Sequence, residues 1–99
     1  TASYLLLGEE KSMTETFGSS CHGAGRTMSR TKARAEIRIE DLRGRLRSAG
    51  IVAEAGSSKG LVEEAPEAYK DIDAVVDVVA RAGIARKVAR FRPIGVVKG

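Results

Sequence analysis

The amino-acid sequence predicts an α+β fold made of short strands and two or three amphipathic helices. Residues 3–7 form a short apolar run, two later segments carry apolar residues at helical spacing, and residues 84–98 lean towards β structure. Strands and helices do not alternate in regular βαβ order. A length of 99 residues with 42% hydrophobic residues allows one small domain with a modest core.

The first part of the chain predicts a strand, a loop and a helix. Residues 3–7 read as a buried strand that ends at Gly8. Residues 9–25 are rich in Gly, Ser and Thr, lack periodicity and predict a long functional loop. A helix is expected to begin near Gly25 and to run to residue 35. Residues 22–25 would then precede a helix N-terminus, where free N–H groups attract anions.

The middle of the chain predicts a second helix and several short elements. Helical spacing connects Ile39, Leu42, Leu46 and Ala49, with Gly50 as a stop. A short strand over residues 51–53, a flexible loop over 56–60 and a helical turn over 63–68 are expected to follow.

The last part of the chain predicts a third helix and further β structure. An apolar stripe at i, i+3, i+4, i+7 and i+8 begins at Ile72 and ends before Gly83. Residues 84–98 follow as a β-leaning segment that Pro93 interrupts.

The charge is unevenly distributed. The net charge is +4, and residues 26–47 carry eight basic side chains against three acidic ones. Residues 81–98 carry six basic side chains and no acidic one, while residues 53–73 are acidic. This pattern indicates a site for a polyanion more than uniform solubility charge. Charge alone leaves solvated helix faces as an open alternative.

Residues 18–26 are the strongest candidate for chemistry, because they hold the chain's one histidine and one cysteine. His22 is a candidate nucleophile, and Gly23 and Gly25 would let a phosphate approach the backbone. Arg26 can bind phosphate oxygens bidentately, and Arg30 would lie one helical turn further on the same face. The alternative is a glycine-rich turn with a structural histidine and solvated arginines. The pattern matches neither a P-loop nor a dinucleotide fingerprint.

Other polar residues leave alternatives open. One Cys and one His do not complete a metal site, which needs three or four ligands, and Cys21 is expected to be a small packed residue. Tyr69 either stacks on a base or caps helix packing. Lys98 follows a β-like segment that would hold it in place.

Residues 19–30, Ser-Ser-Cys-His-Gly-Ala-Gly-Arg-Thr-Met-Ser-Arg, closely resemble the signature of the RtcB family of GTP-dependent tRNA-splicing RNA ligases. Residues 63–71, residues 92–99 and the opening Thr-Ala-Ser-Tyr match the same family. The resemblance implies the C-terminal part of an RtcB-like fold. It makes residues 1–99 a C-terminal segment of a larger RNA ligase domain, with no internal boundary.

The resemblance implies an enzyme that joins RNA ends bearing a 2′,3′-cyclic phosphate or a 3′-phosphate to 5′-hydroxyl ends, with GTP and manganese (Mn2+). The implied catalytic nucleophile is His22, which attacks the α-phosphate of GTP and becomes guanylylated. Arg26 and Arg30 match arginines suited to RNA or nucleotide phosphates. The implied nucleotide-binding residues are Ser3, His22, Gly23, Ala24, Gly25, Tyr69 and Lys98.

The resemblance also implies partners. The family's metal ligands lie upstream, so none is expected on this chain. The expected partners are RNA in the form of tRNA exon halves, the upstream portion of the same enzyme and an archease-type activator, with no membrane. A single cysteine and short apolar runs fit a cytoplasmic location. Because the chain opens directly on an apolar run, we expect a processed product or fragment. Without the upstream region, we expect it to be inactive alone.

Two alternatives to a ligase component stay open. One is a non-catalytic RNA-binding module in which His22 only forms hydrogen bonds, and the other is a structural fragment. Only the ligase interpretation predicts a covalent GMP adduct on His22.

Overall fold

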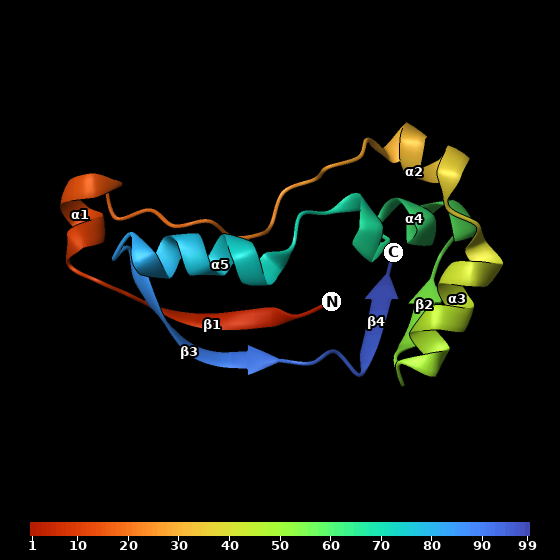
Figure 1. Ribbon diagram of the computed structural model, residues 1–99. Coiled ribbons are helices and arrows are strands. Elements are labelled where there is room, and N and C mark those ends of the chain that lie inside the picture. The colour runs from red at the N-terminus through yellow and green to blue at the C-terminus, as the bar shows by residue number, and fades with distance from the viewer. The chain divides into compact units, whose positions relative to one another are not determined.

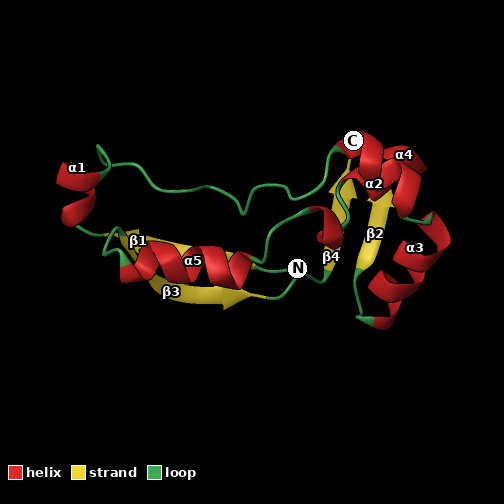
Figure 2. Ribbon diagram, turned by 45° about the horizontal axis from the view of Figure 1, so that its top comes forward, coloured by secondary structure: helices red, strands yellow, loops and turns green.

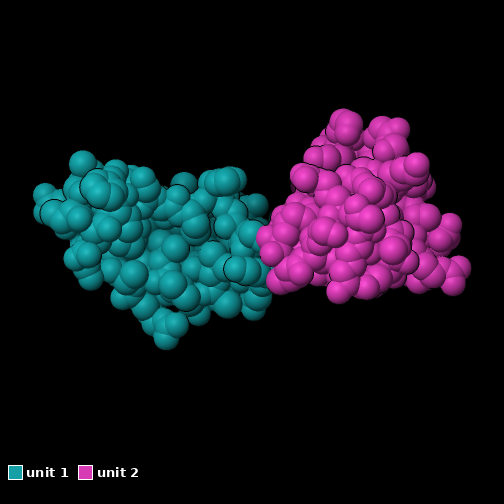
Figure 3. Space-filling model, turned by 90° about the horizontal axis from the view of Figure 1, so that it is seen from above, with its two compact units in different colours: residues 1–25, 70–92 teal, residues 26–69, 93–99 magenta.

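The computed structural model describes all residues from 1 to 99 and confirms the α+β class. It contains five α-helices, one 3-10 helix and four strands in two two-stranded sheets (Figures 1 and 2). The chain forms two compact units (Figure 3): unit 1 comprises residues 1–25 and 70–92, and unit 2 comprises residues 26–69 and 93–99. The absence of an internal domain boundary stays a prediction, because a compact unit is not by itself an independent domain.

Unit 1 is built on an antiparallel pair of strands. Strand β1 (Ser3–Gly8) pairs with β3 (Ala85–Phe91), and the register shifts by one residue between Leu5 and Leu6. Helix α5 (Ile72–Arg81) lies against this pair (Figure 1). The predicted first strand and the predicted β structure before Pro93 are therefore present. The expectation that residues 3–7 are buried was wrong, because Leu5 and Leu7 are 51% and 48% exposed.

Helix α5 forms where its apolar stripe predicts it. Its residue Val76 is almost fully buried, at 2% exposure. The Asp71 side chain caps the first turn by accepting a hydrogen bond from the Asp73 amide at 2.9 Å. Gly83, with a φ of 74°, adopts the left-handed conformation that commonly follows a helix C-terminus.

Helix α1 (Lys11–Glu15) lies inside the predicted loop, so the prediction of a loop over all of residues 9–25 was wrong. The carbonyl of the buried Ser12 accepts hydrogen bonds from the amides of Thr16 and Gly18, at 2.9 and 2.8 Å. Phe17 and Gly18 then take positive φ values and end the turn. Five residues are too few to give a periodic apolar pattern.

Unit 2 packs three helices and a parallel pair of strands around one apolar core. Its elements are α2 (Arg30–Glu36), α3 (Ile39–Ser48), β2 (Val52–Ala55), α4 (Ser58–Glu63), the 3-10 helix η1 (Pro66–Ala68) and β4 (Gly95–Lys98). Strands β2 and β4 pair in parallel from Val52↔Gly95 to Ala55↔Lys98. The buried core residues are Leu42, Leu61, Val62 and Ala65.

Two boundaries in unit 2 differ from the prediction. Helix α2 begins at Arg30, because the Ser29 side chain caps it by accepting from the Lys32 amide at 3.1 Å. Residues 22–25 therefore do not precede a helix N-terminus, and that expectation was wrong. Helix α4 begins within the predicted loop 56–60, where the Ser57 side chain accepts from the Gly60 amide at 3.0 Å.

The remaining predictions for unit 2 are confirmed. Helix α3 follows its apolar spacing and is succeeded by Gly50, which has a φ of 74°. Strand β2 begins at Val52, one residue after the start of the predicted strand. The 3-10 helix η1 provides the predicted turn around Pro66. No helix in the chain combines the length and the apolar character needed to cross a lipid bilayer.

Candidate functional site

The glycine-rich segment in unit 1 carries an accessible histidine. His22 is exposed and makes no hydrogen bond or ion pair with the rest of the chain. Cys21 is also exposed, so the expectation of a packed cysteine was wrong. Gly25 has a φ of 74°, a conformation that favours glycine, and its carbonyl accepts a hydrogen bond from the Lys70 amide at 2.9 Å. A Cβ atom added at Gly23 or Gly25 would meet nothing within 4 Å, so the space beside both backbones is open.

Unit 1 holds five of the seven predicted nucleotide-binding residues. Apart from the partly buried Ala24, they are exposed in this chain. These residues are Ser3, at the start of β1, and His22, Gly23, Ala24 and Gly25.

Unit 2 holds the other four predicted site residues, and it brings them together around one carboxylate. Arg26 and Tyr69 form an isolated antiparallel bridge between backbones that are distant in sequence. The Arg26 Nη1 atom donates to the Tyr69 hydroxyl at 3.0 Å, and the Arg26 guanidinium lies 4.8 Å from the ring centroid. The tyrosine follows η1 directly, and it is half-buried. It contacts other polar side chains rather than only completing helix packing.

Glu64, directly after α4, is the carboxylate at the centre of this group. Its Oε2 atom accepts a hydrogen bond from the Tyr69 hydroxyl. Its Oε1 atom lies 3.7 Å from Arg26 Nη1, 4.0 Å from Arg30 Nε and 4.0 Å from Lys98 Nζ. One oxygen therefore holds the phenol, while the other is shared by three cations at distances longer than a direct hydrogen bond.

Glu63 adds a second carboxylate beside the first. It pairs with Arg34, and its Oε2 atom lies 3.8 Å from Arg30 Nε. Its backbone carbonyl accepts a hydrogen bond from Arg26 Nη2 at 2.6 Å. We call the following residues the carboxylate cluster: Arg26, Arg30, Arg34, Glu63, Glu64, Tyr69 and Lys98. Four cations against two carboxylates leave the cluster with a surplus of positive charge, which attracts anions.

Two pKa shifts fix the hydrogen-bond donor and acceptor in the carboxylate cluster. The hydrogen bond from Tyr69 lowers the pKa of Glu64, and the charges of Lys98, Arg26 and Arg30 lower it further. The hydrogen bond to Glu64 raises the pKa of Tyr69, and partial burial raises it further. At neutral pH the carboxylate is therefore ionised and the phenol keeps its proton.

Lys98 is held by the backbone of the last strand, as its sequence context predicted. It pairs with Ala55 across the β2–β4 ladder, and its carbonyl accepts a hydrogen bond from the Gly56 amide at 2.9 Å. Its side chain stays 46% exposed, so the ammonium group is available to a ligand.

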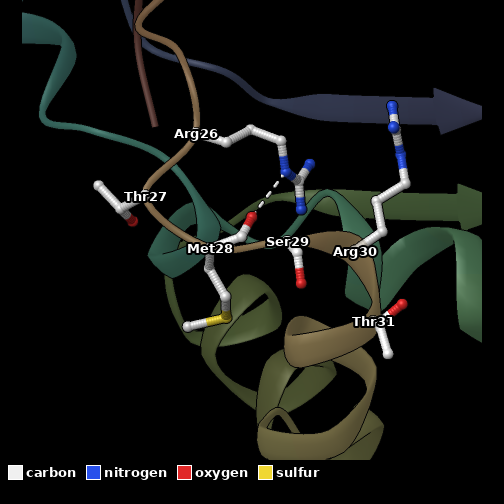
Figure 4. Close-up of a pocket in the computed structure, with 6 residues that line it drawn as sticks. All are labelled: Arg26, Thr27, Met28, Ser29, Arg30 and Thr31. Atoms are coloured by element: carbon white, nitrogen blue, oxygen red, sulfur yellow. Dashed lines mark hydrogen bonds between the residues drawn. The ribbon is translucent and has the colours of Figure 1, made fainter.

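Arg26 and Arg30 flank an open hollow of about 410 Å³ that is lined by residues 26–31 (Figure 4). The Arg26 side chain folds back and donates from Nε to the Met28 carbonyl at 2.9 Å. The expectation that the two arginines lie one helical turn apart was wrong, because Arg26 precedes α2. They nevertheless meet at Glu64, because the bridge to Tyr69 directs the Arg26 side chain there.

A second polar group in unit 1 lies outside the predicted site. Asp73 accepts a hydrogen bond from the Tyr4 hydroxyl at 2.6 Å and a bidentate pair from Arg90 at 3.0 and 3.1 Å. These bonds, above all those from Arg90, lower the pKa of Asp73 to about 2. The group ties α5 to both strands of the sheet.

The chain contains no group of three or more His, Cys, Asp or Glu side chains that could hold a metal ion. The residues present therefore do not form a manganese site.

The reasoning from sequence missed the roles of Glu63 and Glu64. Both lie in an acidic segment, which is typical of a solvated surface. A signal was present, because two acids precede a proline and a tyrosine in an otherwise basic chain. Only the fold places four cations around them.

Comparison with known proteins gives matches along the whole chain. The family model described as "tRNA-splicing ligase RtcB" matches residues 1–99. Proteins named tRNA-splicing ligase RtcB from Methanopyrus kandleri, Thermococcus kodakarensis and Nanoarchaeum equitans are 57%, 58% and 52% identical over all 99 residues. The chain spans 10%, 20% and 21% of these three relatives, respectively.

Proposed function

Because the chain belongs to the tRNA-splicing ligase RtcB family, we propose that it is part of an RNA ligase. The proposed enzyme acts in tRNA splicing and joins RNA 2′,3′-cyclic phosphate or 3′-phosphate ends to 5′-hydroxyl ends. The observation that supports this proposal is the end-to-end family match, which includes the segment around the exposed His22.

His22 is the proposed nucleophile. An imidazole nitrogen attacks the α-phosphorus of GTP, a P–N bond forms, and the bond to the bridging oxygen breaks with release of pyrophosphate. An oxygen of the RNA 3′-phosphate then attacks the same phosphorus and displaces the imidazole. The 5′-hydroxyl oxygen attacks the RNA phosphorus, loses its proton to solvent and releases GMP. An exposed imidazole that makes no hydrogen bond within the chain is available for the first step.

The glycine-rich segment is the proposed phosphate cradle. Backbone N–H groups of Gly23, Ala24 and Gly25 can donate to phosphate oxygens, and the open space beside the two glycines gives a phosphate room. Ser3, Tyr69 and Lys98 are proposed to complete the guanosine part of the site. An ammonium group such as that of Lys98 can donate to the O6 and N7 acceptors of guanine.

Arg26 and Arg30 are the proposed ligands of RNA or nucleotide phosphates. They flank the open hollow, and their cluster keeps a surplus of positive charge. Contacts of this kind hold the RNA backbone without reading its sequence.

The rest of the polypeptide is the first proposed partner of this segment. Manganese would neutralise phosphate charge during the reaction, and its ligands are proposed to lie in that remaining part, since this chain does not form a site. The tRNA exon halves are the proposed substrates, and an archease-type activator stays a prediction.

Peptide mass spectrometry of the full-length protein after incubation with GTP and manganese tests this function. We expect a GMP adduct on the His22 peptide and none in His22→Ala. Cys21→Ser is the matched control, because it changes the adjacent exposed side chain and should keep the adduct. Unfolding curves of both variants should match the wild type, since neither side chain packs in the core.

Absence of the GMP adduct in the wild type would contradict the proposed function. If the folded, metal-loaded wild type forms no adduct, the ligase role is wrong and the non-catalytic RNA-binding module takes its place.

A further inference from the structure

We infer that Glu64 is a positioning residue that fixes Tyr69 and Lys98 in the guanosine part of the proposed site. This inference rests on the proposed function, which assigns those two residues to the nucleotide. It adds a residue that itself need not touch the nucleotide.

The hydrogen bonds of Tyr69 hold its hydroxyl in place within the chain. Its hydroxyl donates to Glu64 and accepts from Arg26, so both of its ordinary bonding positions are occupied within the chain. The hydroxyl therefore fixes the orientation of the ring, and the aromatic face of the ring is the part of Tyr69 that can stack on a base. Removing the carboxylate charge would weaken the stronger of the two bonds, since charged acceptors bind more tightly than neutral ones.

Lys98 is held both by its backbone and by the charge of Glu64. Its backbone is fixed by the β2–β4 ladder, but its side chain is long and half-exposed. The one ion pair of its ammonium group is with Glu64 Oε1, at 4.0 Å. At that distance the charge restrains the ammonium group without using its donors in a direct hydrogen bond. The donors stay available to a nucleobase.

The direction in which GTP affinity changes when Glu64 is neutralised distinguishes a positioning residue from a simple counter-ion. A counter-ion would only reduce the positive charge available to the phosphates of GTP, so its neutralisation should tighten GTP binding. A positioning residue lowers affinity when it is neutralised, because the tyrosine and the lysine lose their fixed places.

The test compares Glu64→Gln with Glu67→Gln in the full-length protein, with formation of the GMP adduct on His22 as the readout. Glu67 is a matched control, since its carboxylate pairs with Arg45 and forms no hydrogen bond or ion pair with Tyr69 or Lys98. We expect Glu64→Gln to raise the KM for GTP by about tenfold, and the rate at saturating GTP to change less than about threefold. Glu67→Gln should leave both values unchanged.

Two further variants keep the inference testable if Glu64→Gln folds poorly. Tyr69→Phe keeps the carboxylate and its three cations, and it should raise the KM for GTP by itself. Combined with Glu64→Gln, it should lose less than the product of the two single effects, because both act on one hydrogen bond. Lys98→Ala should likewise weaken GTP use more than RNA binding.

Failure of the proposed function and failure of the Glu64 role give different results. A wild type without adduct overturns the proposed function, and the inference with it. A wild type with adduct overturns the inference alone if Glu64→Gln matches Glu67→Gln, if it lowers the KM for GTP, or if Tyr69→Phe leaves that KM unchanged.

Discussion

At the scale of single residues, the two sets of predicted site residues are held in different ways. His22 has no polar partner in the chain, whereas Glu64 accepts a hydrogen bond from a phenol and forms ion pairs with three cations. A nucleophile must be accessible to its substrate, and groups that recognise a ligand benefit from being fixed in advance. Of the glycine-rich segment and the carboxylate cluster, the sequence did not predict Arg34 and the two glutamates, because their pairing joins residues that are distant in the chain.

The lowered pKa of Asp73 predicts how the stability of the fold depends on pH. Its folded value of about 2 lies below the ordinary value of 3.8, since the ionised form accepts bonds from Arg90 and Tyr4. Its contribution to stability is therefore fully present above about pH 4 and is lost as the pH falls through about 2. Carbon NMR titration of the carboxyl group should give a midpoint near 2.

Tyr4→Phe should raise that midpoint, because it removes one donor and leaves the Arg90 pair. Tyr69→Phe, in the other unit, should leave it in place. An Asp73 midpoint near 3.8 in the wild type would show that the bonds do not persist in solution.

At the scale of elements, the cap of α4 gives a second prediction. Ser57→Ala removes the acceptor of the Gly60 amide and should lower the free energy of unfolding by about 1 kcal/mol. Ser58→Ala changes the next serine, which makes no side-chain bond, and should alter stability by less than about 0.5 kcal/mol. Urea unfolding of both variants measures the difference, and equal values would contradict the cap.

The elements that the sequence predicted correctly have a repeating apolar pattern. Helices α3 and α5 bury one stripe each, and Gly50 and Gly83 take the left-handed conformation after them. Helices α1 and α4 are too short for such a stripe. Their formation depends on the buried Ser12 and on the core residues Leu61 and Val62, which are tertiary effects that local sequence does not reveal.

The start of α2 is a similar case. The segment from residue 26 to residue 28 contains no helix-breaking residue. The amides of Thr27 and Met28 nevertheless donate hydrogen bonds to the Ala68 carbonyl instead of continuing a helix. Pairing with a segment that lies far away in the sequence set this boundary.

At the scale of the whole molecule, we predict that the isolated chain is inactive. It forms no metal site and covers a minor part of each of its relatives, so the proposed chemistry needs groups that it does not carry. Mass spectrometry should find the His22 adduct only when the chain is joined to, or mixed with, the rest of the protein. An adduct on the chain alone, in GTP and manganese, would reveal a metal site formed in another way.

Unit 1 offers a surface for that assembly. Along β1, Tyr4 and Leu6 alternate with Leu5 and Leu7, which are 51% and 48% exposed. Phe91, opposite the first residue of β1, belongs to the same outer face and is 52% exposed. We expect the rest of the polypeptide to cover this face, because an exposed apolar sheet face favours association.

The pairing of the strands also sets the order of events during synthesis. Strand β1 finds its partner only in β3, and β2 finds its partner only in β4, so both ladders need residues that leave the ribosome late. Helices can form earlier from local contacts, but closing such long loops is slow. Until then, the unpaired backbone groups of β1 and β2 and the apolar side chains of β1 would lie open to other nascent chains and to chaperones.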